Sequence, residues 1–338
     1  MNTYTAAAAK VRALFGGILN ENIYDDLLAK NSVVDIAAYL KGYTVYREVF
    51  RDISPNEIHR GNLELLLKKQ FVMEVNRIYL HIPKEKIAFF SDFDLDFEIE
   101  ILKNIIRGYL TEGHFFGDFK GFAFKRGQEF DFSDLVKSKS LDELINKLKK
   151  TKVSKYILPL LLDKDPALLQ SIETNLDLFY FNNTYNSAEK NLSASEMSFV
   201  RDFLGTRADL YNIVLILRAK KHFNWSREQI IPHIINKYNR VNSDFIYKLA
   251  DSKSFSETLS LLGETDYKKL ADESGFDILS KKYYLSKYIG RIRKSVDFKA
   301  ILYYFQLKKM DIENIITITE TVRYGYPKEE AKKMIVYK

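Results

Sequence analysis

Hydrophobic side chains recur at the spacing of an α-helix along most of the chain. Leu102, Ile105, Ile106 and Tyr109 follow the i, i+3, i+4, i+7 pattern and so share one helix face, and residues 210–217 repeat it. Alternation typical of a β-strand is not found. Long stretches of this kind predict helices over 57–80, 94–111, 166–188, 195–222, 276–294 and 298–324. The pattern therefore predicts an all-α fold.

Local signals divide this helical pattern. Ser54-Pro55 and Asp165-Pro166 are typical helix starts, and Gly325 followed by Pro327 marks a helix end. Residues 122–132 have the weakest helical pattern and are interpreted as a linker. The sequence thus predicts long helices joined by short breaks.

Three acidic residues, Asp92, Asp94 and Asp96, resemble the beginning of a calcium-binding loop. The sixth position of that loop would be Phe97 and the twelfth Lys103, where glycine and glutamate are required. A calcium site is therefore rejected. We interpret the acidic residues as a solvated helix start, where negative charge suits the helix dipole.

One apolar helical stretch occurs three times, each time with an asparagine at its centre. Asn104, Asn212 and Asn314 stand in the sequences LKNII, LYNIV and IENII, at spacings of 108 and 102 residues. A buried asparagine must satisfy its amide group. These side chains could bridge helices within each repeat or bind a partner, and we favour the structural role.

A second element also recurs in the same order. In each copy a short helix ends, a serine caps the next helix, and apolar residues follow at +1, +4 and +8. The three copies are Leu27, Leu28, Ser32, Val33, Ile36 and Leu40; Leu135, Val136, Ser140, Leu141, Leu144 and Leu148; and Leu249, Ala250, Ser254, Phe255, Thr258 and Leu262. Aromatic residues follow each copy, at Tyr43 and Tyr46, Tyr156, and Tyr267. We call each copy a hook.

The two repeated elements predict three similar domains at 1–114, 115–224 and 225–338. Each would combine a hook of short helices with a pair of long antiparallel helices. A period near 100 residues is the size of a domain and too long for a solenoid repeat. Chance similarity between amphipathic helices is the alternative explanation.

The composition excludes several classes of chemistry. The 338 residues contain no cysteine, which excludes a disulfide scaffold, a thiolate zinc site and a cysteine nucleophile. The glycines fit neither the Walker nor the dinucleotide-binding spacing, and a Gly-x-Ser-x-Gly motif is absent. The five histidines form no pair with metal-ligand spacing. We therefore predict no catalytic residue, no metal site and no cofactor.

Positive charge is concentrated in the last part of the chain. The net charge is +7, and residues 206–338 alone carry 25 basic and 16 acidic side chains, an excess of nine. Six basic residues close together form a candidate interface: Lys281, Lys282, Lys287, Arg291, Arg293 and Lys294. Such a cluster could face nucleic acid, an anionic membrane surface or an acidic protein. A solvated helix face is the simpler interpretation.

The sequence shows no signal peptide and no apolar run near the roughly 20 residues that a membrane-spanning helix needs. The longest apolar runs are residues 156–162 and 213–217. From these features we expect a soluble cytoplasmic protein.

Several of these segments together resemble a known family. Residues 11–14 (VRAL), the hook from Tyr24 to Tyr46, residues 212–220 (NIVLILRAK), residues 313–316 (ENII) and residues 323–325 (RYG) are similar to the C subunit of the bacterial and archaeal V/A-type ATPases, the family of the eukaryotic vacuolar ATPase d subunit. The resemblance covers nearly the whole chain. It departs at Thr317 and Thr319, where the other copies of the helix have larger apolar residues.

The resemblance implies an all-helical funnel of three similar domains around a pseudo-threefold axis. It implies a non-catalytic central-stalk subunit, present in one copy on the cytoplasmic face of the membrane. The implied partners are the proteolipid rotor ring and the shaft subunits D and F, and the membrane stator subunit is a further candidate. The implied role is to transmit torque during ion pumping or ATP synthesis, without nucleotide or cofactor.

Other functions are compatible with the residues. An all-helical nucleic-acid-binding module could use the basic C-terminal surface, because Tyr283, Tyr284 and Tyr288 lie among the basic residues and could stack on bases. No recognition motif for nucleic acid accompanies them. An unrecognised helical enzyme and a scaffold of another complex are further alternatives.

Overall fold

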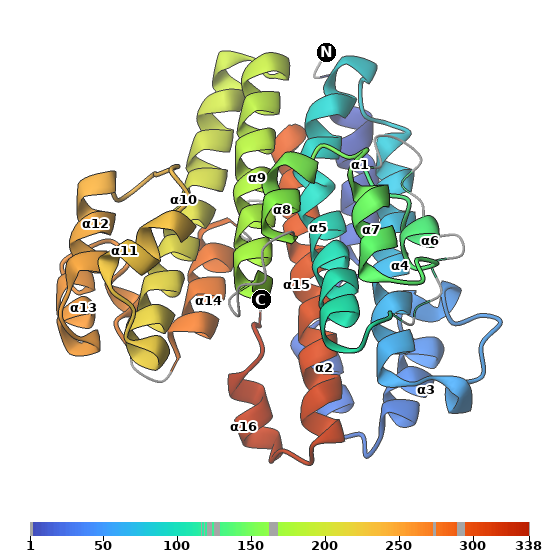
Figure 1. The fold of residues 1–338 in the computed structure, drawn as a ribbon. Helices are drawn as coiled ribbons and strands as arrows, with labels where there is room; N and C mark the ends of the chain where they lie inside the picture. Colours follow the sequence, from blue (N-terminus) through green and yellow to red (C-terminus); the bar gives the residue numbers. More distant parts are fainter. Residues whose placement is uncertain are drawn as a thin grey trace. The chain divides into compact units, whose positions relative to one another are not determined.

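The computed structural model describes residues 3–115, 117, 119, 124, 129–161, 168–272, 275–288 and 295–337. This described part of the chain is helical and contains no strand (Figure 1). The all-α prediction is therefore confirmed.

The chain forms two compact units. Unit 1 comprises residues 1–87, 114–138 and 285–338, and unit 2 comprises residues 88–113 and 139–284. One break between the units, at 113/114, lies next to the predicted repeat boundary at 114, whereas the predicted boundary at 224 lies inside unit 2. The three-domain funnel stays a prediction.

Unit 1 joins the two ends of the chain. Its helices are α1 (Thr5–Phe15), α2 (Glu21–Leu28), α3 (Val33–Tyr43), α4 (Arg60–Tyr79), α6 (Phe132–Leu135), α15 (Phe298–Arg323) and α16 (Lys328–Lys333), with 3-10 turns at Val45–Glu48, Pro55–Glu57 and Lys84–Lys86. The long helix α15 packs against α1, α2, α3 and α4. Phe305 of α15 makes edge contacts with Phe71 and Tyr79, at ring-centre distances of 6.0 and 6.4 Å. The N-terminal hook thus packs on the last long helix of the chain.

Unit 2 is built around another long helix, α10. Its helices are α5 (Ile87–Thr111, after its first residue), α7 (Leu141–Leu148), α8 (Ser154–Leu161), α9 (Leu168–Asn191), α10 (Ala194–Arg218), α11 (Arg227–Ile230), α12 (Ser243–Asp251), α13 (Phe255–Leu262) and most of α14 (Phe276–Tyr288). A π-helical turn at Ala219–Phe223 extends α10, and 3-10 turns occur at Ile231–His233 and Lys268–Leu270. Helix α10 packs against α9 and against the hook helices α12 and α13 (Figure 1).

The serine caps that the sequence predicts are confirmed in all three hooks. The side chains of Ser32, Ser140 and Ser254 accept the backbone N–H three residues ahead, at 3.1, 3.3 and 3.2 Å. Each cap satisfies one of the free N–H groups at the start of its helix. The hooks therefore begin with the same local structure.

The long helices follow the predicted ranges closely, with one clear exception. Helix α5 begins at Ile87, seven residues before the predicted start, so that the acidic residues lie inside it. Asp94 and Asp96 are buried, and Asp96 pairs with Arg207 at 2.7 Å. The solvated helix start was therefore a wrong interpretation, because a partner distant in sequence compensates the charge. Most of the predicted linker lies outside the described residues, as does the end of the predicted helix 276–294.

Candidate functional site

A buried aspartate lies three residues before the repeated asparagine on both α10 and α15. Asp209 and Asp311 are 0% and 1% exposed, and each accepts a hydrogen bond from the tyrosine of a hook. We call their surroundings the Asp209 cluster and the Asp311 cluster. These two clusters fix short helices onto the long helix of their unit.

The Asp311 cluster in unit 1 contains three hydroxyl or N–H donors and an ammonium group. Tyr24 and Tyr46 donate hydroxyl hydrogen bonds to the carboxylate at 2.6 and 2.9 Å, and the N–H of Leu19 donates at 3.3 Å. Lys308 places its Nζ 3.6 Å from Asp311 Oδ2 and 4.2 Å from the centre of the Tyr46 ring. The carboxylate thus ties residues 19–46 to α15.

Lys308 also pairs with a second buried carboxylate. Its Nζ lies 3.4 Å from Glu74 Oε1, and Glu74 accepts hydrogen bonds from Tyr304 at 2.7 Å and Gln70 at 2.8 Å. The Lys308 side chain is fully buried, so leaving either charge unpaired would be costly. Burial raises the pKa of the hydroxyl groups of Tyr46 and Tyr304 well above the ordinary value, so both remain donors.

The Asp209 cluster in unit 2 uses backbone donors in place of the lysine. Tyr267 donates its hydroxyl at 2.7 Å, and the backbone N–H groups of Arg240 and Asn239 donate at 2.7 and 3.1 Å. Thr206 is the residue of α10 that corresponds to Lys308 of α15, because the two copies of the helix are 102 residues apart. Burial raises the pKa of Asp209, and the hydrogen bonds from Arg240 and Tyr267 oppose that rise.

The repeated asparagines have a structural role in two of the three copies. Asn212 exchanges two hydrogen bonds with the backbone of Ile235, at 2.9 and 2.8 Å. Asn314 makes the same pair with Val336, at 2.7 and 2.9 Å. Asn104 is only half-buried, and its side chain accepts a bond from Arg107 at 3.3 Å. The structural interpretation is therefore confirmed for the copies in α10 and α15.

The remaining copy has apolar residues at the same positions. The position of the aspartate, three residues before the asparagine, is occupied by Ile101 in this copy. The position of the tyrosine, two residues after a threonine in each hook (Thr44, Thr151 and Thr265), is occupied by Val153. Both residues are buried. Tyr156, which the sequence suggested as the aromatic of this hook, instead packs on Phe179 at 5.1 Å. The buried tyrosine-aspartate contact is thus a feature of two copies.

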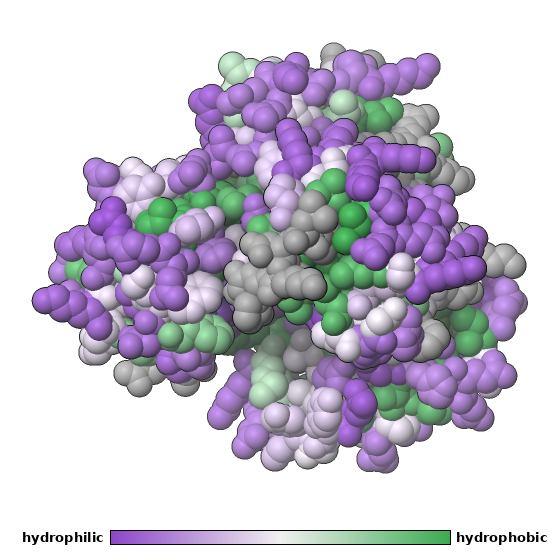
Figure 2. Space-filling model, viewed as in Figure 1, coloured by the Kyte–Doolittle hydropathy of each residue, from purple (hydrophilic) through white to green (hydrophobic). Residues whose placement is uncertain are grey.

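The predicted basic interface is described in part. Lys281 and Lys282 are exposed on α14, whereas Lys287 is half-buried with its Nζ 5.1 Å from the Tyr288 ring centre. Arg291, Arg293 and Lys294 lie outside the described residues. Hydrophilic residues cover most of the face shown in Figure 2, so exposed lysines do not by themselves mark an interface. The role of this cluster stays a prediction.

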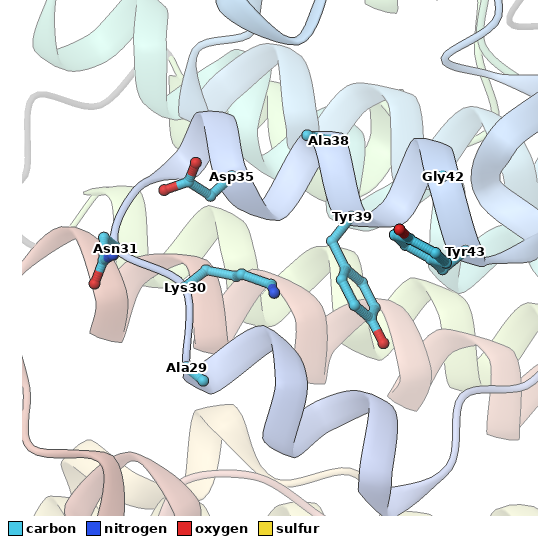
Figure 3. A pocket seen from close by; sticks show the side chains of 8 residues that line it. All are labelled: Ala29, Lys30, Asn31, Asp35, Ala38, Tyr39, Gly42 and Tyr43. Atoms are coloured by element: carbon cyan, nitrogen blue, oxygen red, sulfur yellow. The ribbon is translucent and has the colours of Figure 1, made fainter.

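One open groove lies along the first hook (Figure 3). Its lining residues are Ala29, Lys30, Asn31, Asp35, Ala38, Tyr39, Gly42 and Tyr43. Tyr39 donates to Asp26 at 2.5 Å, and this bond is the main reason that the pKa of Tyr39 rises to about 12. Lys30 places its Nζ 4.6 Å from the centre of the Tyr39 ring. The tyrosine is therefore held by neighbours and is not poised as a general acid or base near neutral pH.

The described part of the chain has neither a metal-binding cluster nor a membrane-spanning helix. In that part, no group of three His, Cys, Asp or Glu side chains is placed to hold a metal ion. Among the helices described, none is long and apolar enough to cross a bilayer.

Comparison with known proteins gives a consistent family. The family model described as ATP synthase (C/AC39) subunit matches residues 7–334. The chain is similar to the A-type ATP synthase C subunit of Methanobrevibacter smithii, with 22% identity over 354 aligned positions covering 98% of this chain and 88% of that protein. It is 23% identical to the protein of the same name from Methanosphaera stadtmanae, with the same coverage. The corresponding protein of Methanocaldococcus jannaschii is 26% identical over 226 positions, 62% of this chain and 55% of that protein.

Proposed function

Since the chain belongs to the ATP synthase (C/AC39) subunit family, we propose that it is the non-catalytic central-stalk subunit of a rotary A/V-type ATPase. In this proposal it couples the shaft formed by subunits D and F to the proteolipid ring of the membrane rotor. It would transmit torque in whichever direction the complex runs, ion pumping or ATP synthesis.

The observation that carries the proposal is the family match over residues 7–334, together with relatives named as the C subunits of A-type ATP synthases. The construction of each unit agrees with a mechanical role. A torque-transmitting part must resist sliding of one helix over another. Buried polar contacts such as Tyr46 to Asp311 and Tyr267 to Asp209 fix the hooks to the long helices at defined registers.

The same proposal specifies the environment of the chain. A single copy would lie on the cytoplasmic face of the membrane as a peripheral subunit, with the stator subunit as a further neighbour. No nucleotide, metal or other cofactor would be bound by this chain itself, and no nucleic acid would accompany it.

The proposal is tested by affinity purification of a tagged chain from detergent-solubilised native membranes, followed by mass spectrometry. We expect the proteolipid and subunits D and F in one complex, with one copy of this chain. Purification from the same membranes with the tag on an unrelated cytoplasmic protein provides the control. Recovery of nucleic acid, or of the chain without membrane subunits, would contradict the proposal.

A further inference from the structure

After each of the long helices α15 and α10, the chain turns back and contacts that helix at its repeated asparagine. We call residues 334–337 the unit 1 strap and residues 233–236 the unit 2 strap. Each strap follows a short helix, α16 or α11, and contains two buried apolar residues. These are Ile335 and Val336 in unit 1, and Ile234 and Ile235 in unit 2.

The unit 1 strap is fixed to α15 by one side chain. Asn314 accepts a hydrogen bond from the N–H of Val336 at 2.9 Å and donates one to its carbonyl at 2.7 Å. The next residue, Tyr337, places its ring edge-on against the ring of Tyr24, with 6.2 Å between the ring centres. The strap therefore covers a buried amide of α15 and a buried ring of the first hook.

The unit 2 strap leads directly into the Asp209 cluster. The backbone N–H groups of Asn239 and Arg240, a few residues beyond the strap, donate to the Asp209 carboxylate at 3.1 and 2.7 Å. The Asn239 side chain also donates to the hydroxyl of Thr206 at 2.7 Å. The chain then continues into the hook helix α12. The unit 2 strap thus belongs to the same continuous segment that binds the buried aspartate.

The unit 1 strap does not lead into the hook that it contacts. The first hook follows α1, and the groups that bind Asp311 in the described structure all lie outside the strap. They are the N–H of Leu19, the hydroxyl groups of Tyr24 and Tyr46, and the ammonium of Lys308. Detaching the strap would therefore leave the first hook bound to α15.

The anchors on the two sides of each strap differ accordingly. Helix α16 anchors the unit 1 strap on one side, since it packs on α2 and its Lys332 pairs with Asp25 at 2.9 Å (Figure 1). The unit 2 strap is anchored on both sides, by α11 and by residues 239–240. A segment with two fixed ends gains less conformational entropy on detaching than a segment with one.

We propose that the unit 1 strap opens while the rest of unit 1 stays folded, and that it acts as a latch over Asn314 and Tyr24. Opening uncovers the amide and the ring, so it changes the surface of unit 1 without detaching the hook. The unit 2 strap stays closed under the same conditions. This inference goes beyond the coupling role and concerns the chain alone, so it can fail while that role holds.

The test uses an introduced thiol as the reporter of opening, because the chain has no natural cysteine. Val336→Cys and the matched control Ile235→Cys are each made in the full chain and treated with iodoacetamide under native conditions. Mass spectrometry follows the modification, and each rate is divided by that of the same variant unfolded in urea. We expect Val336→Cys to react at least about tenfold faster, because opening the unit 2 strap also breaks hydrogen bonds to a charged carboxylate.

Low concentrations of urea distinguish local opening from unfolding. They should leave the reaction of Val336→Cys almost unchanged, because local opening exposes little surface. Equal rates for the two variants would overturn the proposal. So would a rate for Val336→Cys that rises with urea as steeply as global unfolding does.

Hydrogen exchange of the unsubstituted chain provides a second measurement, which does not depend on how the cysteine variants fold. The N–H groups of Val336 and Ile235 are matched, since each donates to the side chain of a repeated asparagine. We expect the peptide that contains Val336 to exchange at least about tenfold faster than the peptide that contains Ile235, for the same reason. Equal protection of the two peptides would overturn the proposal.

Discussion

The Asp311 and Asp209 clusters both fix a hook to a long helix, but the group that compensates the buried carboxylate differs between them. Each holds a hook tyrosine against a buried aspartate on a long helix, at 2.9 Å in unit 1 and 2.7 Å in unit 2. In unit 1 the compensating group is the buried ammonium of Lys308, whereas unit 2 uses backbone N–H groups of residues 239 and 240. Similar geometry therefore does not imply similar energetics.

The difference indicates where the protein is most sensitive to substitution. A buried ion pair contributes little net stability but becomes strongly destabilising when one partner is removed. A carboxylate held by backbone donors depends on no single side chain for its compensation. Unit 1 should therefore be more vulnerable than unit 2 at this position.

The sharpest test of this comparison is Lys308→Met. The variant leaves Asp311 and Glu74 buried without their cation, so the free energy of unfolding should fall by about 3–5 kcal/mol. Thr206→Val, the matched change in unit 2, removes the hydroxyl that accepts a hydrogen bond from the Asn239 amide at 2.7 Å and should cost only about 1 kcal/mol. Chemical denaturation measures both. A second variant, Lys308→Met with Glu74→Gln, should recover part of the loss, and equal losses at Lys308 and Thr206 would contradict the comparison.

Removing the repeated asparagines should have the next largest effect. Asn314→Ala removes the partners of the buried Val336 N–H and carbonyl, which should cost about 2–4 kcal/mol. Asn212→Ala should cost about 1–3 kcal/mol, because it leaves the Ile235 N–H without its partner while the Ile235 carbonyl keeps the N–H of Lys237. Asn104→Ala should change stability by less than about 0.5 kcal/mol, because that side chain is half-buried. Thermal or urea unfolding of the three variants provides the measurement. A large effect at Asn104 would show that all three copies are equivalent after all.

Removing the Tyr267 hydroxyl should weaken unit 2 more at neutral pH than at acidic pH. Tyr267→Phe should cost about 1.5–3 kcal/mol at pH 7, since the hydroxyl bonds a charged group. The pKa of Asp209 is higher in the folded protein than in the unfolded chain. Its contribution to the stability of the protein is therefore fully present below the unfolded pKa and is lost as pH rises through the folded pKa. Loss of the Tyr267 bond raises that pKa further, so the variant should lose more stability at pH 7 than at pH 4. Denaturation at the two pH values tests this, and a loss that is larger at pH 4 would contradict it.

Alkaline titration should reveal the buried tyrosines. Burial raises the pKa of Tyr24, Tyr46 and Tyr304, so above pH 10 the unfolded state releases protons that the folded state retains. Stability should therefore fall with pH, and each such tyrosine adds about 1.4 kcal/mol per pH unit to the slope. Tyr46→Phe should reduce the fall in stability between pH 10 and 11 by about 1 kcal/mol, because a free tyrosine is only half ionised at pH 10. Urea unfolding at the two pH values measures this. An unchanged slope would mean that Tyr46 ionises in the folded protein.

The serine caps should show small effects, and these effects should differ least between the two units. Ser32→Ala, Ser140→Ala and Ser254→Ala should each cost about 1 kcal/mol, because each leaves one helix N–H without its cap. Unlike the cluster residues, the three caps should give similar values. Thermal unfolding of the single variants checks this, and a spread of several kcal/mol would show that the hooks are not locally equivalent.

Much of the fold was predictable because it depends on local pattern. The helical class, the serine caps and the structural role of Asn212 and Asn314 follow from side-chain spacing and from the need to satisfy an amide. The repeat also pointed to the hook tyrosines Tyr46 and Tyr267. The helices and the serine caps depend on residues that are close in sequence, whereas the partners of the asparagines and of the hook tyrosines lie farther along the chain.

The charged contacts were not predictable, because their partners are far apart along the chain. Tyr24 and Asp311 are 287 positions apart, and Arg207 and Asp96 are 111 apart. The sequence pattern alone makes a charged residue on a helix indistinguishable from a solvated one, which is why it fails for Asp96 and does not point to Lys308. An alignment of the three copies on Thr44, Thr151 and Thr265 does reveal two differences between them. Thr206 provides no cation, and Ile101 and Val153 are apolar where the other copies have an aspartate and a tyrosine.

The coupling role itself is tested most directly by ion transport in vesicles that hold the whole ATPase, assembled with and without this chain. The account predicts that ATP hydrolysis persists without the chain while ATP-driven ion transport is lost, and that adding the purified chain restores transport. Equal transport in vesicles with and without the chain would contradict the proposal that it connects the shaft to the rotor ring.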